Sequence, residues 1–256
     1  MASLMAVFEE LLRVKEDKGA GFFLLLDPDR ADRSRLTNVA ESAAAKGVDA
    51  ILVGSSFLIC SNFDSCVMDI KRHCDLPVIL FPGNATQISR HADAILFLSL
   101  ISGRNPNFLI EEQVKGAPQI KTYGLEPIPT GYMLIESGTM TSVQYVSGTM
   151  PIPRDKYDIA MAHALAAKYM GMKTIYLEAG SGARQPVPTE MVRAVVDYCH
   201  LPVIVGGGIR QPEEAAARVA AGASFIVIGT RLESEEDSQY IAEMADAIHL
   251  SAKTSI

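Results

Sequence analysis

Short apolar runs alternate with amphipathic helical patterns along almost the whole chain, and this alternation predicts βα units around a parallel sheet. Eight apolar runs are expected to be strands: Phe22–Leu26, Ala50–Gly54, Val78–Phe81, Ala94–Leu98, Ile120–Gly124 with a possible continuation at Tyr132–Ile135, Thr174–Glu178, Val203–Gly206 and Phe225–Gly229. Helices are expected between them, at Arg33–Lys46, Phe63–His73, Asp155–Gly171, Pro188–His200 and Pro212–Ala221. Eight strands with short connections favour a closed (β/α)8 barrel, the TIM barrel, over an open sheet.

One stretch breaks this alternation. Between Gly116 and Pro153 the sequence is rich in Gly, Pro, Thr and Tyr, and it shows no convincing helical pattern. We therefore expect one barrel helix to be replaced there by an irregular segment. A loop of that length is usually functional or disordered, and its apolar and aromatic content argues against disorder. The sequence leaves open whether this segment covers an apolar ligand or forms a subunit interface.

Composition narrows the class of protein. The chain has 256 residues and is 48% hydrophobic, so a single domain spanning 1–256 with a large core is expected. Its 23 basic and 30 acidic residues give a net charge of −7 without a basic block, which disfavours nucleic acid as a partner. No apolar run approaches the ~20 residues that cross a bilayer, and the N-terminal sequence is typical of an acidic amphipathic helix rather than a signal peptide. The four cysteines show no metal-site spacing. A cytoplasmic protein without a transmembrane segment is expected.

Glycine occurs at three successive predicted strand ends, in Tyr176–Gly182 (YLEAGSG), in Gly206–Arg210 (GGGIR) and in Gly229–Arg231 (GTR). Glycine lets backbone N–H groups approach an anion closely, and the helix expected after Arg210 directs its positive N-terminal end toward the same place. Loops after the seventh and eighth strands of such barrels recurrently bind phosphate. Any one of these glycines is explained equally well by a tight turn, but three together predict a cup for a small phosphate ester.

Two side chains of the sixth predicted strand are expected to reach this cup. Glu178 ends the strand, and Tyr176 shares its face by the two-residue alternation of a strand. A carboxylate at this position can accept hydrogen bonds from a polyol phosphate and take a proton from a hydroxyl that becomes a nucleophile. The alternative is a structural ion pair between Glu178 and a nearby Arg or Lys.

The opposite side of the expected mouth is acidic. The first strand ends in Leu26-Asp-Pro-Asp-Arg30, and the second in Val53-Gly-Ser-Ser56. Mg2+ typically takes one or two protein carboxylates and keeps waters or substrate phosphates as its other ligands. Asp27, at the strand end, is the better ligand, whereas Asp29 is equally well explained as a helix cap, a task that Asp32 or Ser34 can also perform. The residues alone therefore point to two phosphorylated substrates, one of them bound with Mg2+.

The segments LLLDPDR, ILVGSS, YLEAGSGA, VGGGIR and VIGTR together resemble the geranylgeranylglyceryl phosphate synthase family, including its bacterial relatives that make heptaprenylglyceryl phosphate. The resemblance covers nearly the whole chain and favours the second subgroup of the family. It implies a (β/α)8 barrel with one helix replaced by an irregular segment. It also implies Mg2+-dependent transfer of a polyprenyl group, expected to be geranylgeranyl, from its diphosphate to the 3-hydroxyl of sn-glycerol 1-phosphate. That reaction releases diphosphate and is the first step of ether-lipid biosynthesis.

The resemblance also assigns roles to single residues. Asp27 and Ser56 would bind Mg2+, and Glu178 with Tyr176 would be catalytic. The acceptor would be bound by Tyr176, Leu177, Glu178, Ala179, Gly180, Ser181, Gly182, Gly207, Gly208, Gly229 and Thr230. Some family members have a lysine where this chain has Leu25, so Arg30 or Arg210 is expected to supply the missing charge. The apolar tail is expected near Phe97, Tyr123 and Tyr132.

Two other functions remain open at this point. One is a different phosphate-ester barrel enzyme of the isomerase or aldolase type, which needs an Asp pair or a Schiff-base lysine at the mouth. The other is a non-catalytic barrel that binds a phosphate ligand, against which the presence of both Asp27 and Glu178 argues. A homo-oligomer, a dimer or a hexamer, is expected because the Gly116–Pro153 segment carries so many apolar residues. The sequence indicates neither the tail length nor the source organism.

Overall fold

The computed structural model describes residues 6–229 and 236–250. Eight parallel strands pair in chain order and close into a barrel, because the last strand also pairs with the first. The strands are β1 (Gly21–Leu26), β2 (Ala50–Val53), β3 (Val78–Leu80), β4 (Ala94–Leu100), β5 (Glu126–Leu134), β6 (Thr174–Glu178), β7 (Val203–Gly206) and β8 (Phe225–Gly229). The predicted TIM barrel is confirmed.

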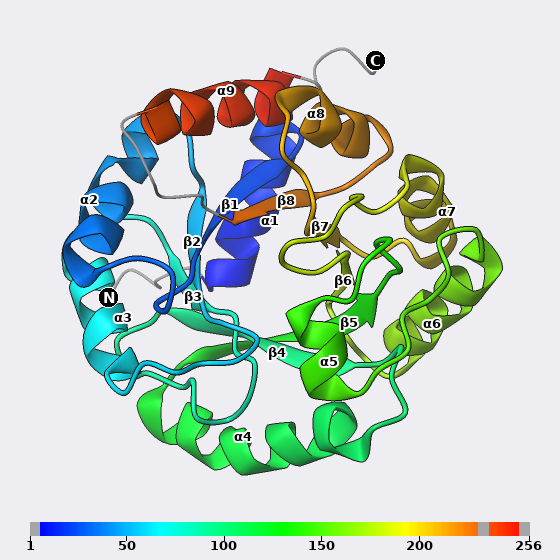
Figure 1. The fold of residues 1–256 in the computed structure, drawn as a ribbon, viewed down its shortest axis with the longest axis horizontal. Coiled ribbons are helices and arrows are strands. Elements are labelled where there is room, and N and C mark those ends of the chain that lie inside the picture. The colour runs from blue at the N-terminus through cyan, green and yellow to red at the C-terminus, as the bar shows by residue number, and fades with distance from the viewer. Residues whose placement is uncertain (1–5, 230–235, 251–256) are drawn as a thin grey trace.

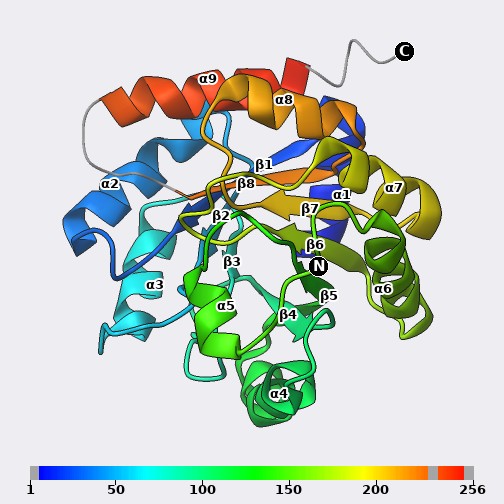
Figure 2. The ribbon, with the colours of Figure 1, turned by 45° about the vertical axis from the view of Figure 1, so that its right-hand side comes forward.

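Helices surround the strands (Figure 1). They are α2 (Arg33–Ala43) with the short η1 (Ala44–Lys46), α3 (Phe63–Arg72), η2 (Asn107–Glu111) leading into α4 (Glu112–Tyr123), α6 (Tyr157–Tyr169), α7 (Thr189–Cys199), α8 (Pro212–Ala220) and α9 (Glu236–Leu250). A short helix, α5 (Ser142–Ser147), lies nearer the barrel mouth than the outer helices in both ribbon views (Figures 1 and 2). No helix of the described residues is both long and apolar enough to span a membrane.

The strands bury both of their faces, which explains why they read as continuous apolar runs. One face packs against the surrounding helices, and the other fills the barrel interior, where the rings of Phe23 and Phe225 stack with centroids 4.7 Å apart. The first helix, α1 (Val7–Lys18), adds Leu11 to this interior cluster and so closes the bottom of the barrel. Its N-terminus is fixed by the Glu126 carboxylate, which accepts hydrogen bonds from the Val7 and Phe8 N–H groups at 2.5 and 3.3 Å, as the helix dipole favours.

The predicted fifth strand is wrong over Ile120–Gly124, whereas its possible continuation at Tyr132–Ile135 overlaps the end of β5. Residues 120–123 belong to helix α4, and the strand runs from Glu126 to Leu134 instead. Gly116 suggested a helix break, but its role is close packing, since a Cβ there would lie 2.9 Å from the Ile88 side chain. The prolines of β5, at 127 and 129, precede Thr130, the first residue of β5 that pairs with β6. They therefore remove no N–H from the paired part of that ladder.

The replaced helix also lies elsewhere than predicted. Residues 81–93, between β3 and β4, contain no helix, whereas α4 follows β4 and α6 follows β5. The irregular part of the 116–153 region is confined to the end of β5 onward, where α5 interrupts it. The segment after β3 is held instead by a buried side chain: the Gln87 amide accepts from the Ser55 N–H at 3.0 Å and donates to the Ser55 carbonyl at 2.8 Å.

Candidate active site

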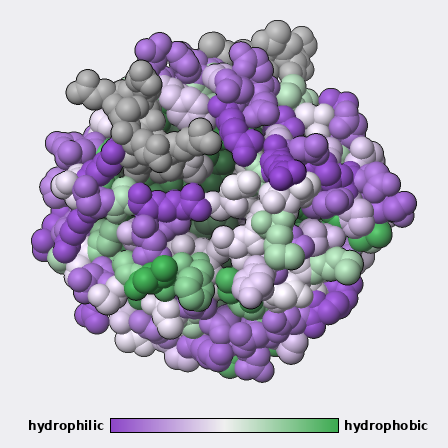
Figure 3. All heavy atoms as spheres, in the orientation of Figure 1, coloured by the Kyte–Doolittle hydropathy of each residue, from purple (hydrophilic) through white to green (hydrophobic). Residues whose placement is uncertain are grey.

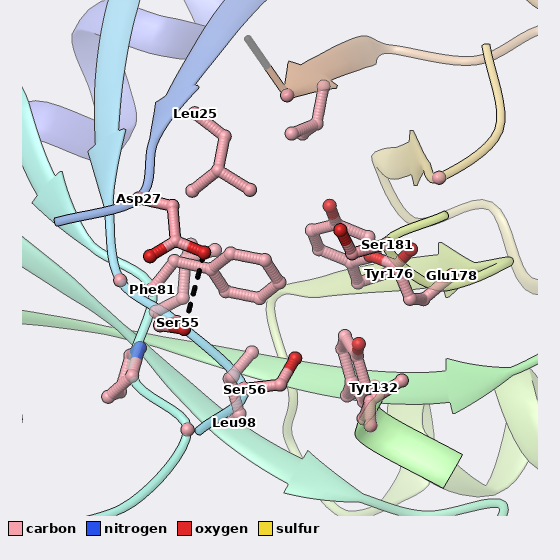
Figure 4. Close-up of a pocket in the computed structure, with 18 of the residues that line it drawn as sticks. Leu25, Asp27, Ser55, Ser56, Phe81, Leu98, Tyr132, Tyr176, Glu178 and Ser181 are labelled. Carbon is pink, nitrogen blue, oxygen red and sulfur yellow. Dashed lines mark hydrogen bonds between the residues drawn. The ribbon is translucent and has the colours of Figure 1, made fainter. Parts of the chain in front are cut away.

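A cavity of about 700 Å³ opens at the carboxyl ends of the strands, and residues at or near the ends of all eight strands line it (Figure 4). On the space-filling view of this face, hydrophobic side chains gather near the centre and hydrophilic ones form most of the periphery (Figure 3). Catalytic residues of such barrels come from the ends of several strands at this face. The cavity therefore occupies the place where the sequence put its candidate residues.

Glu178 lies at the inner wall of the cavity and is 5% exposed. Burial raises the pKa of its carboxyl group to about 7, although the Gly180 N–H, which donates to Oε1 at 2.5 Å, and the Tyr176 hydroxyl both favour the charged form. No Lys or Arg of the described residues forms an ion pair with it. The alternative of a structural ion pair is thus absent from this part of the chain, and the carboxylate is able to exchange a proton near neutral pH.

Three aromatic rings stand beside this carboxylate. Tyr176 is fully buried, its ring stacks on Phe81 with centroids 5.1 Å apart, and Tyr132 is tilted against it at 5.3 Å. Burial raises the pKa of both tyrosines well above the usual value, so both hydroxyls stay neutral. The Tyr176 hydroxyl makes no hydrogen bond of good geometry with the described residues. Phe81 was not among the predicted site residues, because a phenylalanine that ends an apolar strand carries no distinguishing signal.

The glycine cup is built from backbone that only glycine adopts readily. Gly207 and Gly208 have φ of 82° and 74°, and Gly182 has φ of 78°. A Cβ on Gly207 would stand 2.3 Å from Glu178 Oε1, so only a residue without a side chain lets the end of β7 approach this carboxylate so closely. The Glu214 carboxylate already accepts hydrogen bonds from the two N–H groups just before α8, those of Arg210 at 2.7 Å and Gln211 at 3.2 Å. An anion in the cup would therefore be bound mainly by the N–H groups of the glycines.

The residues assigned to the acceptor separate into two groups. Tyr176, Glu178, Ser181, Gly182, Gly207, Gly208 and Gly229 line the cavity. Leu177 and Ala179 point the other way, into the core between the barrel and its helices, as strand alternation requires. Gly180 contributes its N–H to Glu178 and faces Thr141 rather than the cavity. Thr230 lies outside the described residues.

Across the mouth, Asp27 is the centre of a small polar group. Its carboxylate accepts from Asp29 N at 3.0 Å and from the Ser55 hydroxyl at 3.3 Å, and its Oδ2 lies 3.3 Å from Arg30 Nε. Burial raises the pKa of Asp27, whereas these neighbours lower it. Ser55 is the serine in contact with this carboxylate, and Ser56, the predicted metal ligand, lines the cavity beside it (Figure 4).

The carboxylate of Asp29 is hydrogen-bonded to backbone N–H groups. Its two carboxylate oxygens accept from the N–H groups of Ile59 and Cys60, both at 2.7 Å, and so fix the loop after β2. The cap of α2 is Asp32, which accepts from Arg35 N at 2.9 Å. Within the described ranges, no cluster of three or more His, Cys, Asp or Glu side chains exists. The donor set at this side is therefore one carboxylate with serine hydroxyls, which suits Mg2+ completed by phosphate and water rather than an all-protein metal site.

An apolar arm extends the cavity sideways over β4. Leu96 and Leu98 point into the barrel and Phe97 points outward, yet all three line the cavity. The arm continues to Ile88, after β3, and to Ile120 on α4. It occupies the side of the barrel where the connection after β3 has no helix. Of the residues expected near the tail, Phe97 and Tyr132 line the cavity, whereas Tyr123 does not and packs under Arg90 instead.

The chain was compared with known proteins. The model of the PcrB family matches residues 12–248. Geranylgeranylglyceryl phosphate synthase of Chitinophaga pinensis is 48% identical over 231 residues, 90% of this chain and 91% of that protein, and the enzyme of Thermococcus gammatolerans is 49% identical over 226 residues, 88% and 89%. The crystal structure of (S)-3-O-geranylgeranylglyceryl phosphate synthase from Thermoplasma acidophilum in complex with substrate sn-glycerol-1-phosphate superimposes with a TM-score of 0.91. It is 37% identical and covers 96% of this chain and 100% of that one.

Proposed function

Because the chain belongs to the PcrB family and is a prenyltransferase of the geranylgeranylglyceryl phosphate synthase type, we propose that it joins a polyprenyl group to the 3-hydroxyl of sn-glycerol 1-phosphate. One observation carries this proposal: a buried carboxylate with a pKa of about 7 stands between a glycine cup and an apolar arm of the same cavity. The cup suits a phosphate and the arm suits a hydrocarbon. The relative from Thermoplasma acidophilum, solved with sn-glycerol-1-phosphate, supports this acceptor.

The chemistry follows from the positions of the side chains. Glu178 accepts the proton of the glycerol 3-hydroxyl while the hydroxyl oxygen forms a bond to C1 of the prenyl chain. The bond between C1 and the diphosphate oxygen breaks, and diphosphate leaves with the electron pair. Positive charge develops on the allylic C1 as that bond lengthens. The faces of the Phe81, Tyr132 and Tyr176 rings are electron-rich and favour such a charge.

We propose that Mg2+ is held by Asp27 together with the hydroxyl of Ser55 or Ser56. The partly buried Asp27 carboxylate supports this, because burial disfavours its charge and raises its pKa, and a bound cation would stabilise the charged form. When bound, the ion neutralises charge that develops on the leaving diphosphate. Asp29 keeps the loop after β2 in place by accepting its two N–H groups, and Gln87 holds the backbone of Ser55.

The donor is expected to be geranylgeranyl diphosphate, with its tail along the arm between β4 and α4. The lining of the arm supports this, because Ile88, Phe97 and Ile120 offer no polar side chain to a hydrocarbon. The aldolase alternative is weakened, since no lysine lines the cavity in the described part of the chain. The non-catalytic alternative gives no reason for a carboxylate with a pKa near 7.

We also propose a homo-oligomer. Tyr169 and Met170, at the end of α6, are 80% and 71% exposed, and Tyr198 on α7 is 48% exposed. Exposed apolar groups of this size often mark association surfaces. Sedimentation velocity at micromolar concentration measures the mass, and a monomer throughout would contradict the proposal.

The activity is tested by incubating the purified protein with sn-glycerol 1-phosphate, Mg2+ and labelled prenyl diphosphates of increasing length. Formation of the ether product with release of diphosphate is expected, and sn-glycerol 3-phosphate serves as the matched control acceptor. If no donor yields product from sn-glycerol 1-phosphate, the proposal is wrong.

A further inference from the structure

We propose that Arg30 binds the diphosphate of the prenyl donor. When the donor binds, the guanidinium group leaves the Asp27 carboxylate and forms hydrogen bonds with the diphosphate instead. This inference rests on the proposed function, since it names the residue that recognises one of the two substrates. It also identifies a positively charged residue at the barrel mouth, where this chain has Leu25 in place of the lysine of some family members. Leu25 lines the cavity with an uncharged side chain.

Arg30 reaches from one side of the mouth to the other. Its Nη2 donates to the Ser181 hydroxyl, on the rim of the glycine cup, at 2.9 Å, and its Nε lies 3.3 Å from Asp27 Oδ2. Its own N–H donates to the Asp27 carbonyl at 3.1 Å, so the turn after β1 fixes the start of the side chain above the mouth. The guanidinium thus lies between the cup for the acceptor and the carboxylate for the metal.

The charges of the residues that line the cavity favour Arg30 as the residue that binds the diphosphate. Among the described residues that line it, the acids are Asp27, Glu112, Glu178 and Glu243, and the cations are Arg30 and Arg210. A diphosphate carries several negative charges and needs cationic partners in such surroundings. Arg210 is already held by the backbone of the cup, because it donates to the carbonyl oxygens of Ala183 and Arg184 at 2.5 and 3.3 Å. Arg30 is the cation whose partners are side chains.

Those partners are easily exchanged. The Arg30 side chain is 58% exposed, and an exposed ion pair is worth little because water and salt screen it. A guanidinium binds phosphate oxygens through paired hydrogen bonds, which are stronger than its single contact with Asp27. Transfer of Arg30 to the diphosphate frees the Asp27 carboxylate for a cation. Binding of the donor and binding of Mg2+ are therefore expected to reinforce each other.

The test uses the full-length protein with Arg30→Ala and Arg30→Lys. Isothermal titration calorimetry with inorganic diphosphate in the presence of Mg2+ should show an affinity that is about tenfold or more lower in Arg30→Ala, in keeping with the loss of a charged hydrogen bond. Titration with Mg2+ alone should show equal or tighter binding, since Asp27 loses a competing cation. Arg30→Lys keeps a point charge and should recover part of the affinity. Arg72→Ala, which removes an exposed arginine from α3, is the matched control.

Steady-state kinetics gives an independent readout. The KM for the prenyl diphosphate should rise about tenfold in Arg30→Ala, while the KM for sn-glycerol 1-phosphate should change less than about threefold. Unchanged diphosphate affinity, or a change confined to the KM of the acceptor, would overturn the proposal. So would a parallel loss of Mg2+ and diphosphate binding, which indicates a distorted mouth. A wild-type protein that forms no ether product would contradict the proposed function. If Arg30→Ala nevertheless binds diphosphate more weakly than that wild type, Arg30 remains a diphosphate-binding residue.

Discussion

The two sides of the barrel mouth are built in different ways. The side formed by β6, β7 and β8 presents backbone and one buried carboxylate to the cavity, and several of its glycines have positive φ values that other residues rarely adopt. The side formed by β1 and β2 binds through exposed or half-buried side chains, Asp27, Arg30 and Ser55, which contact one another. The first side is shaped before any substrate arrives. The second is proposed to change partners, which would suit a diphosphate that must be bound and then released.

The largest effect is expected at the preformed side. Glu178→Gln keeps the shape but removes the proton acceptor, so kcat should fall by about 10²- to 10⁴-fold, while sn-glycerol 1-phosphate still binds. Wild-type activity should rise with pH through about 7 and then level off, because the carboxylate with that pKa must be ionised to accept a proton. A pH-rate profile measures this. A wild-type kcat in Glu178→Gln would show that this carboxylate is not the proton acceptor.

Asp27→Asn tests the exchangeable side. It keeps the hydrogen-bonding size but loses the charge, so the Mg2+ concentration for half-maximal rate should rise at least tenfold, about the loss of one charged ligand contact. The KM for sn-glycerol 1-phosphate should stay nearly constant, because the acceptor binds opposite. Metal titrations of activity measure both quantities. An equal loss of acceptor binding would show that the two sides are not separate.

A smaller effect is expected from the rigidity of the cup. Gly207→Ala places a Cβ 2.3 Å from Glu178 Oε1 and also strains a backbone with φ of 82°. Gly171→Ala has the same strain, with φ of 83°, but open space around the new methyl group, and it lies at the end of α6. Gly171→Ala should lose about 1–2 kcal/mol of stability through the left-handed backbone alone. Gly207→Ala should lose more, because its Cβ would also lie 2.5 Å from the Gly180 backbone nitrogen. Thermal unfolding measures both losses. Only Gly207→Ala should weaken acceptor affinity, by about tenfold, and equal affinities would refute a steric role for this glycine.

The smallest effect is expected at the aromatic rings between the two sides. Phe81→Leu keeps an apolar side chain but removes the ring that stacks on Tyr176. A cation–π contribution of about 1 kcal/mol predicts a fall in kcat of about five- to tenfold. The KM values should change little, since neither phosphate contacts this ring. Rapid-quench measurement of a single turnover separates the chemical step from product release, and an unchanged rate there would exclude a role for Phe81 in the transition state.

The sequence predicted the backbone-built side better than the side-chain-built side. Glycines at three strand ends indicate a close approach of the backbone, and glycines from all three ends line the cavity; that they bind phosphate stays a prediction. The hydrogen bond between Ser55 and Asp27 could not be predicted, because both serines follow the strand and only the loop geometry distinguishes them; Ser56 as a metal ligand stays a prediction. Gln87 carried no signal, since its two hydrogen bonds with Ser55 depend on a chain reversal 32 residues away.

The closed barrel was predictable because its strands are buried on both faces, and a continuous apolar run records that burial. The fifth strand was misplaced because Pro127 and Pro129 resemble a loop, and their tolerance depends on where β6 begins to pair. The helix containing Pro118 was missed for a similar reason, since proline normally ends a helix. Such exceptions are set by neighbouring elements, which a single sequence does not show.

The side opening left by the missing helix after β3 has a consequence for how the protein could be modified. In the proposed function, bond formation and selection of tail length take place in separate parts of the cavity, because the barrel mouth would hold the reacting atoms while the arm between β4 and α4 would hold the hydrocarbon. Under the proposed function, positions 116 and 120 of α4 lie along the tail, so the Ile120 side chain, or a side chain introduced at Gly116, is expected to limit the number of isoprene units without touching the cup. Product length should therefore be adjustable by engineering one helix face, with the catalytic rate left in place.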